Sequence, residues 1–86
     1  MEEEYRAAVK KFYETYRPMA RRYNLRMQSH FSMRHDGWIK IYKREGTSEK
    51  MIVKCEEEND VECYRRATEA LTSWECKKRE RQKAAG

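Results

Sequence analysis

Along residues 2–23 the apolar residues recur at alternating gaps of four and three, the spacing that gathers side chains on one face of a helix. Pro18 lies within this pattern, where it removes a backbone N–H and disfavours helical angles at Arg17. The pattern predicts a helix over 2–23 that kinks at Pro18, or breaks there so that Pro18 opens a short second helix. The stripe consists of Tyr5, Val9, Phe12, Tyr16, Met19 and Tyr23.

From residue 25 the apolar period changes to two, which is typical of strands with one buried face. The first predicted strand spans 25–34, and Asp36-Gly37 favours a tight type I′ turn into a second strand over 38–44. The side expected to face the core carries Leu25, Met27, Phe31, Met33, Ile39 and Ile41, with Ser29 as a small exception. The opposite side carries Arg26, Gln28, His30, Ser32, Arg34, Trp38, Lys40, Tyr42 and Arg44.

A second turn around Gly46 leads to a third strand, and a last helix follows the EEEND run at 56–60. In that strand we expect Met51, Val53 and Cys55 to face inward and Lys50, Ile52 and Lys54 to face outward. Asn59 or Asp60 is a suitable N-cap for the helix. Its apolar stripe is Val61, Tyr64, Ala67, Leu71 and Trp74. The basic segment 77–86 is expected to fray into a tail.

These elements predict an α+β fold of αβββα order, with a three-stranded antiparallel sheet and both helices packed on one of its faces. A single domain would cover residues 1–76. Charged residues make up 41% of the 86 residues and hydrophobic ones 38%, so the core must be thin and the surface dense in charge. Aromatic residues at 12% argue against disorder.

Composition also restricts the class of protein. No apolar run approaches the roughly 20 residues that span a bilayer, and the acidic start MEEEY does not resemble a signal peptide. We therefore expect a cytoplasmic protein without membrane contact. The three cysteines are separated by seven and twelve residues, which fits neither a disulfide framework nor a zinc site. Reduced thiols, no metal and no cofactor are expected.

The formal net charge of +5 is unevenly distributed. Segment 25–55 has seven basic and three acidic residues, whereas segment 56–76 has two and seven. With both helices on one face, the other face of the sheet is left open and carries six cations with Trp38 and Tyr42. Cations that replace phosphate counterions, beside rings that stack on bases, are what a nucleic-acid surface needs. An exposed sheet kept polar against edge aggregation would show the same residues, so both interpretations stay open.

The candidate residues for contact with nucleic acid or another partner all lie on the predicted strands. They are Arg26, His30, Arg34, Trp38, Lys40, Tyr42, Arg44, Ile52 and Lys54. No glycine-rich phosphate loop, nucleophile elbow or two-histidine metal motif occurs, and the chain has only three glycines. We therefore expect a protein that is not an enzyme and has no small-molecule substrate.

Two family resemblances bear on the fold. The αβββα order resembles the double-stranded-RNA-binding domain, whose last helix begins with a lysine-rich segment. Here that place reads EEENDVECYRRATEAL, so the order matches and the site residues do not. Residues 34–75 look like the βββα arm-binding domain of phage and transposon integrases, with a DG turn, a glycine turn, and Ala67 and Trp74 seven apart. That resemblance implies a sheet face that enters the DNA major groove.

By position, the integrase resemblance implies contacts from Trp38, Lys40, Tyr42, Arg44 and Lys54. Size and charge density are also similar in style to small phage-encoded inhibitors, including anti-CRISPR proteins. Two hypotheses follow. The chain is a mobile-element binding module that contacts nucleic acid or a nucleoprotein, or it inhibits a host nuclease by direct protein contact. A homodimer through the open sheet is a further possibility.

Overall fold

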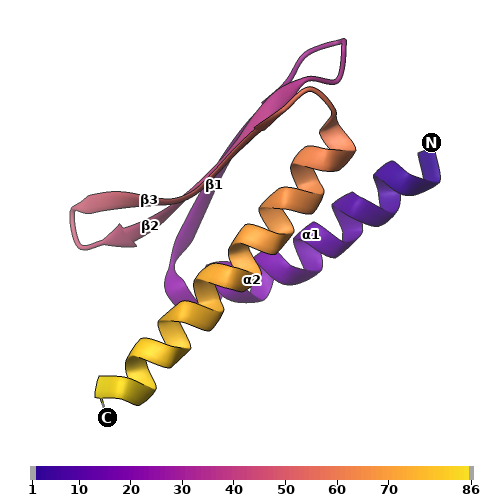
Figure 1. Cartoon of the computed structure of the whole chain (residues 1–86). Helices are drawn as coiled ribbons and strands as arrows, with labels where there is room; N and C mark the ends of the chain where they lie inside the picture. The colour runs from indigo at the N-terminus through magenta and orange to yellow at the C-terminus, as the bar shows by residue number, and fades with distance from the viewer. Residues whose placement is uncertain (1, 86) are drawn as a thin grey trace.

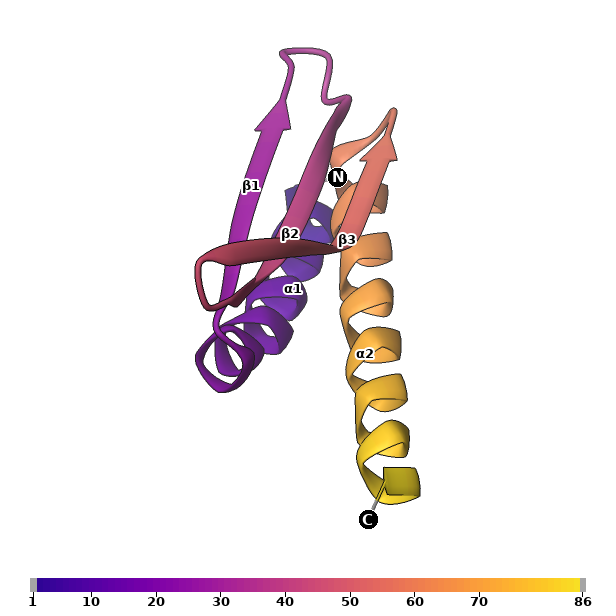
Figure 2. The ribbon, with the colours of Figure 1, turned by 90° about the vertical axis from the view of Figure 1, so that its left-hand side faces the viewer.

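In the computed structural model, which describes residues 2–85 and the side chains of residues 2–81, two helices pack against a three-stranded meander. The elements are α1 (Glu2–Tyr23), β1 (Leu25–Phe31), β2 (Gly37–Glu45), β3 (Ser48–Glu57) and α2 (Asp60–Ala85). The strands pair antiparallel in the order β1-β2-β3. Both helices lie on one face of the sheet and leave the other uncovered (Figures 1 and 2). The predicted fold is therefore confirmed.

The core lies between the two helices and the covered face of the sheet. Phe12 of α1, Ile39 and Ile41 of β2, and Leu71 of α2 have no exposed surface. These are the residues that the helical and alternating patterns predicted to face inward. Among the described residues, neither α1 nor α2 has the long uncharged apolar segment that a membrane-spanning helix needs.

The helix α1 continues through Pro18 without a break, so the alternative of two separate helices is wrong. Pro18 lacks the N–H that would bond to the carbonyl of Glu14. Met19, directly after it, is only 4% exposed, and Tyr23 packs against the core. Burial of these two side chains holds the last turns of α1 in place despite the missing hydrogen bond.

The start of α2 has the predicted cap. The side-chain oxygen of Asn59 accepts hydrogen bonds from the backbone N–H groups of Val61 (2.8 Å) and Glu62 (3.3 Å). An N-cap side chain satisfies backbone donors that have no partner within the helix. At its other end α2 extends to Ala85, so the segment expected to fray is helical that far, and Gly86 lies outside the described residues.

The connection from β1 to β2 differs from the predicted type I′ turn. The strand β1 ends at Phe31, and the loop spans residues 32–36. The positive φ (71°) is at His35, and neither residue of the Asp36-Gly37 pair has one. The loop is closed by the N–H of Ser32 donating to the carbonyl of Asp36 (2.8 Å) and the N–H of His35 donating to that of Ser32 (3.0 Å).

Gly37 begins β2 opposite Phe31 instead of forming the turn. A Cβ on Gly37 would lie 2.1 Å from the carbonyl oxygen of His30, so close approach of the backbone requires glycine here. Because β1 is shorter than predicted, Met33 lies in the loop. It was expected to face the core and is 99% exposed.

A β-bulge in β3 changes the predicted faces of the strand. Ile41 pairs with Val53, but Tyr42 pairs with Met51, which leaves Ile52 as an extra residue. Ile52, predicted to face outward, packs against the core, and Met51, predicted to face inward, is 45% exposed. The alternation of the sequence cannot reveal a bulge, because it assumes an uninterrupted period of two.

The inverted faces continue to the end of the hairpin. Lys50, predicted on the uncovered face, is the cross-strand partner of Lys43 on the helix side. Glu49 instead lies opposite Arg44 on the uncovered face, and an Nε–Oε2 distance of 3.9 Å between them confirms the assignment. The hairpin formed by β2 and β3 bends away from the rest of the sheet as it nears its tip (Figure 1).

Candidate functional site

The open face of the sheet is the surface turned away from the helices. The strand register places on it four cations, two carboxylates, two large aromatic residues, His30, Gln28 and Met51. Its charged and aromatic members are Arg26, Trp38, Lys40, Tyr42, Arg44, Glu49, Lys54 and Glu56. Figure 2 looks onto this face with both helices behind it. The open face is therefore basic overall, but less so than the sequence predicted.

Two lysines lie at the centre of the open face. Lys40 of β2 and Lys54 of β3 are directly opposed across the strands. Like charges in this position destabilise a sheet. Among the described side chains, no carboxylate forms an ion pair with either amine. The pair thus leaves two positive charges available to an external anion.

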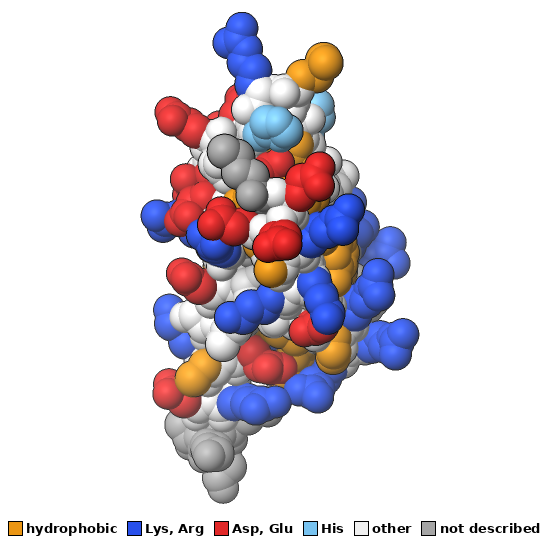
Figure 3. All heavy atoms as spheres, turned by 90° about the vertical axis from the view of Figure 1, so that its right-hand side faces the viewer, with side chains coloured by type: hydrophobic (Ala, Val, Ile, Leu, Met, Phe, Trp, Pro, Cys, Tyr) orange, Lys and Arg blue, Asp and Glu red, His pale blue; other side chains and the backbone are white. Residues whose placement is uncertain are grey.

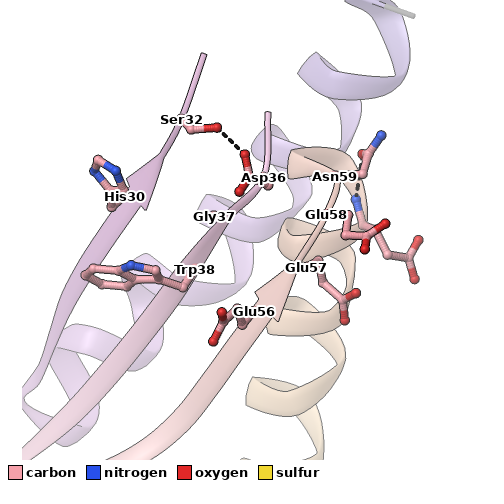
Figure 4. A pocket seen from close by; sticks show the side chains of 10 residues that line it. His30, Ser32, Asp36, Gly37, Trp38, Glu56, Glu57, Glu58 and Asn59 are labelled. Atoms are coloured by element: carbon pink, nitrogen blue, oxygen red, sulfur yellow. Dashed lines mark hydrogen bonds between the residues drawn. The ribbon is translucent and has the colours of Figure 1, made fainter. Parts of the chain in front are cut away.

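An aromatic residue adjoins this pair. The Nζ atom of Lys40 lies 4.6 Å from the ring centroid of Trp38, a distance typical of a cation–π interaction. His30 is the cross-strand partner of Trp38, and the two ring centroids are 6.2 Å apart. Figure 4 shows the indole and the imidazole side by side on neighbouring strands. Trp38, His30 and Lys40 thus form one continuous aromatic and cationic surface.

The hairpin half of the open face is charge-compensated. Arg26 of β1 crosses the ring of Tyr42, with its guanidinium 4.7 Å from the centroid. It then donates two hydrogen bonds, of 2.7 and 2.9 Å, to the carboxylate of Glu49 on β3. The bond from Arg26 lowers the pKa of Glu49, and this carboxylate in turn raises the pKa of Arg26. Arg26 and Tyr42 are therefore already engaged with groups of the protein itself.

Two predicted site residues are not on the open face. Ile52 is the bulge residue and packs against the core. Arg34 lies in the loop beyond the end of β1, where it lines a hollow with Tyr5, His35 and Arg65. Both errors follow from assuming that alternation continued unbroken. The other seven predicted residues lie on the open face as expected.

An acidic region borders the open face at the end where the helices begin. Glu56, Glu57 and Glu58 line one side of a shallow hollow whose other side includes Trp38 and His30 (Figure 4). The hydroxyl of Ser32 donates to the carboxylate of Asp36 at its rim. A neighbouring hollow contains the acidic side chains of Glu2, Glu4, Glu58, Asp60 and Glu62. Figure 3 shows acidic side chains gathered toward this end and basic ones over much of the rest of the view.

Metal ligation finds no support in the described residues, which contain no group of three His, Cys, Asp or Glu side chains suited to an ion. The Nδ1 atom of His35 instead lies 3.1 Å from a carboxylate oxygen of Asp60, joining the β1–β2 loop to the start of α2. The contact is a structural link between two segments.

Comparison with known proteins assigns no family: no protein-family model, no curated protein and no solved structure matches this chain. The resemblances to integrase arm-binding domains, to double-stranded-RNA-binding domains and to small phage inhibitors therefore stay predictions.

Proposed function

We propose that this protein is a small, non-catalytic, cytoplasmic binding module of phage or mobile-element type that contacts nucleic acid, free or within a nucleoprotein, through its open face. Lys40 and Lys54 would neutralise backbone phosphates, and Trp38 would stack on a base or sugar. Each neutralised phosphate releases counterions, which supplies most of the affinity in contacts of this type.

The observation that carries the proposal is the opposed pair of Lys40 and Lys54 beside Trp38. A solvated sheet face would be expected to alternate charges of opposite sign across the strands, as Arg44 and Glu49 do. An uncompensated like-charged pair beside a large aromatic residue instead suits an anionic, planar ligand. Arg44 lies on the same face and would add a peripheral contact.

A protein partner is the second candidate function, and Met51 is the observation that favours it. Met51 is 45% exposed and lies opposite Tyr42, so the hairpin half of the open face presents an apolar patch beside the Arg26–Glu49 ion pair. Aromatic residues, Met and Arg are enriched at protein interfaces. An inhibitor of a host nuclease would use this patch, and a second copy of the chain would give a homodimer.

Fluorescence anisotropy with labelled single-stranded DNA, duplex DNA and duplex RNA across a salt series tests the proposal. The variant Lys40→Gln/Lys54→Gln removes the central pair. The matched control is Lys10→Gln/Lys11→Gln, which removes two exposed charges from α1. In the first variant we expect the slope of log affinity against log salt to fall by about 0.7 to 0.9 for each phosphate that the protein no longer neutralises. The control should keep the original slope.

Equal slopes in the two variants would contradict contact through the open face. If the protein bound all three nucleic acids and lost this binding at modest salt, the binding would be non-specific electrostatic attraction due to the net charge of +5. In that case Met51→Ser and Tyr42→Ala would be tested for loss of a protein complex.

A further inference from the structure

A second group of cations lies on the helix side of the hairpin, away from the open face. The side-chain amines of Lys43 of β2 and Lys78 of α2 are neighbours, since each is the strongest influence on the pKa of the other. This contact, together with partial burial, lowers the pKa of Lys78. Lys43 is largely covered, with its side chain 22% exposed. Two amines held this close repel each other when both are protonated.

The bulge in β3 brings a third lysine to the same place. Because Ile52 is extra, Lys50 becomes the cross-strand partner of Lys43 on the helix side. Without the bulge, Lys50 would point to the open face. The nearest acidic partner of the group is Glu45, whose carboxylate is 3.5 Å from the amine of Lys43. Lysines from three different elements thus lie on the helix side of the hairpin, and Glu45 pairs with one of them, Lys43.

Aromatic rings fix the position of Lys78. Its Nζ atom lies 5.3 Å from the ring centroid of Tyr23 and 5.1 Å from that of Trp74. These two rings pack edge to face, with centroids 5.1 Å apart. A lysine held by two aromatic faces loses less side-chain freedom when it binds an anion than an unrestrained surface lysine does. Nearby, Glu75 is occupied by Arg22 at 3.1 Å and Arg79 at 3.7 Å, so it does not neutralise the lysines.

We infer that Lys43, Lys50 and Lys78 form a phosphate-binding site, and that it holds a backbone phosphate of the nucleic acid bound by the open face. This inference rests on the proposed function for the source of the phosphate. Lysine binds phosphate as a point charge, and a phosphate between these amines would offset their mutual repulsion. A nucleic-acid strand that passes the hairpin would then contact both sides of it.

The test compares the wild type with Lys43→Gln/Lys78→Gln and with the charge-matched control Lys10→Gln/Lys11→Gln. Thermal unfolding is followed with pyrophosphate, and with sodium chloride at the same ionic strength. We expect pyrophosphate to raise the melting temperature of the wild type and the control and to leave that of the double variant unchanged.

The salt dependence of nucleic-acid binding is measured on the same three proteins. We expect the slope to be smaller in Lys43→Gln/Lys78→Gln by about 0.7 to 0.9 for each phosphate that the variant fails to neutralise, and unchanged in the control. An unchanged slope in the double variant would overturn the inference and leave contact through the open face intact. Equal stabilisation of all three proteins by pyrophosphate would also overturn it.

A third result separates this site from the proposed function. If no nucleic acid binds but pyrophosphate stabilises only the proteins that retain Lys43 and Lys78, the phosphate site stands and its source is a free phosphate compound. The proposed function would then be wrong. Stabilisation by polyglutamate but not by pyrophosphate would overturn the phosphate assignment in favour of an acidic protein segment.

Discussion

Cys63 lies in the core with no exposed surface, and its thiol donates a hydrogen bond to the backbone carbonyl of Cys55 at 3.6 Å. Burial, followed by the neighbouring Cys55 and Glu57, raises the pKa of Cys63 to about 11. Only the thiolate is nucleophilic, and at pH 8 roughly one Cys63 in a thousand would be ionised. Burial and a raised pKa therefore both protect this thiol, whereas Cys76 is exposed on α2.

We expect a thiol reagent at pH 8 to modify Cys76 rapidly and Cys63 only after unfolding. The free energy of unfolding should also become smaller between about pH 9 and pH 11, because the unfolded chain releases the Cys63 proton at a lower pH than the native state does. Timed alkylation followed by mass spectrometry measures the first effect, and urea unfolding at several pH values the second. The variant Cys76→Ser is the control that shows whether the rapidly modified thiol is Cys76. Modification of all three thiols at one rate would contradict the buried position of Cys63.

At the scale of elements, the bulge in β3 determines which of two adjacent apolar residues stabilises the fold. Ile52 packs against the core, while Met51 is 45% exposed on the open face. We expect Ile52→Ser to lower the free energy of unfolding by about 1 to 2 kcal/mol. Met51→Ser should change it by less than about 0.5 kcal/mol. Urea denaturation of both variants measures the difference.

If Met51→Ser lowered the free energy of unfolding more than Ile52→Ser did, the result would support a strand without a bulge, in which Met51 is buried. A loss of stability in both variants would indicate that the hairpin stabilises the fold through both of its faces. Circular dichroism of the two variants would show whether the strands are retained, so that a difference in unfolding reflects side-chain burial.

Both helices and all three strands were predictable because each has a clear period that tertiary contacts reinforce. The stripe from Tyr5 to Tyr23 continues past Pro18, and its packing outweighs the local preference for a break. The bulge was not predictable, since Met51, Ile52 and Val53 are three consecutive apolar residues that fit either alternation. One residue of slip exchanges the faces of a strand, which is why Ile52 and Lys50 were placed wrongly.

The candidate site was predictable only as a surface. Which residues share the open face follows from alternation, and seven of nine are placed as expected. The pairing of Arg26 with Glu49 was not predictable, because it crosses β2 to join strands that are not neighbours. The contact of Lys43 with Lys78 depends equally on how α2 lies against the hairpin, which no local pattern encodes.

At the scale of the whole molecule, charge is arranged along an elongated body of 46 × 25 × 19 Å. At the end where both helices begin, five acidic side chains line a hollow and outnumber its two arginines, and lysines gather around the hairpin. An anionic strand would therefore be repelled from the first region and attracted to the second, which orients it during encounter. Glu56 lies on the open face opposite Trp38, at the boundary between the two regions.

This arrangement predicts that the position of an acidic side chain affects nucleic-acid binding more than its contribution to the net charge does. We expect Glu56→Gln to strengthen nucleic-acid binding roughly twofold near 0.1 M salt, because it removes a repulsive charge within a Debye length of the contact. Glu69→Gln removes the same charge from an exposed position on α2 and should have a smaller effect. Anisotropy titrations of both variants across a salt series give the comparison, and the gain from Glu56→Gln should shrink as salt screens the charge. Equal gains in the two variants would mean that total charge sets the affinity, and contact through the open face would then be contradicted.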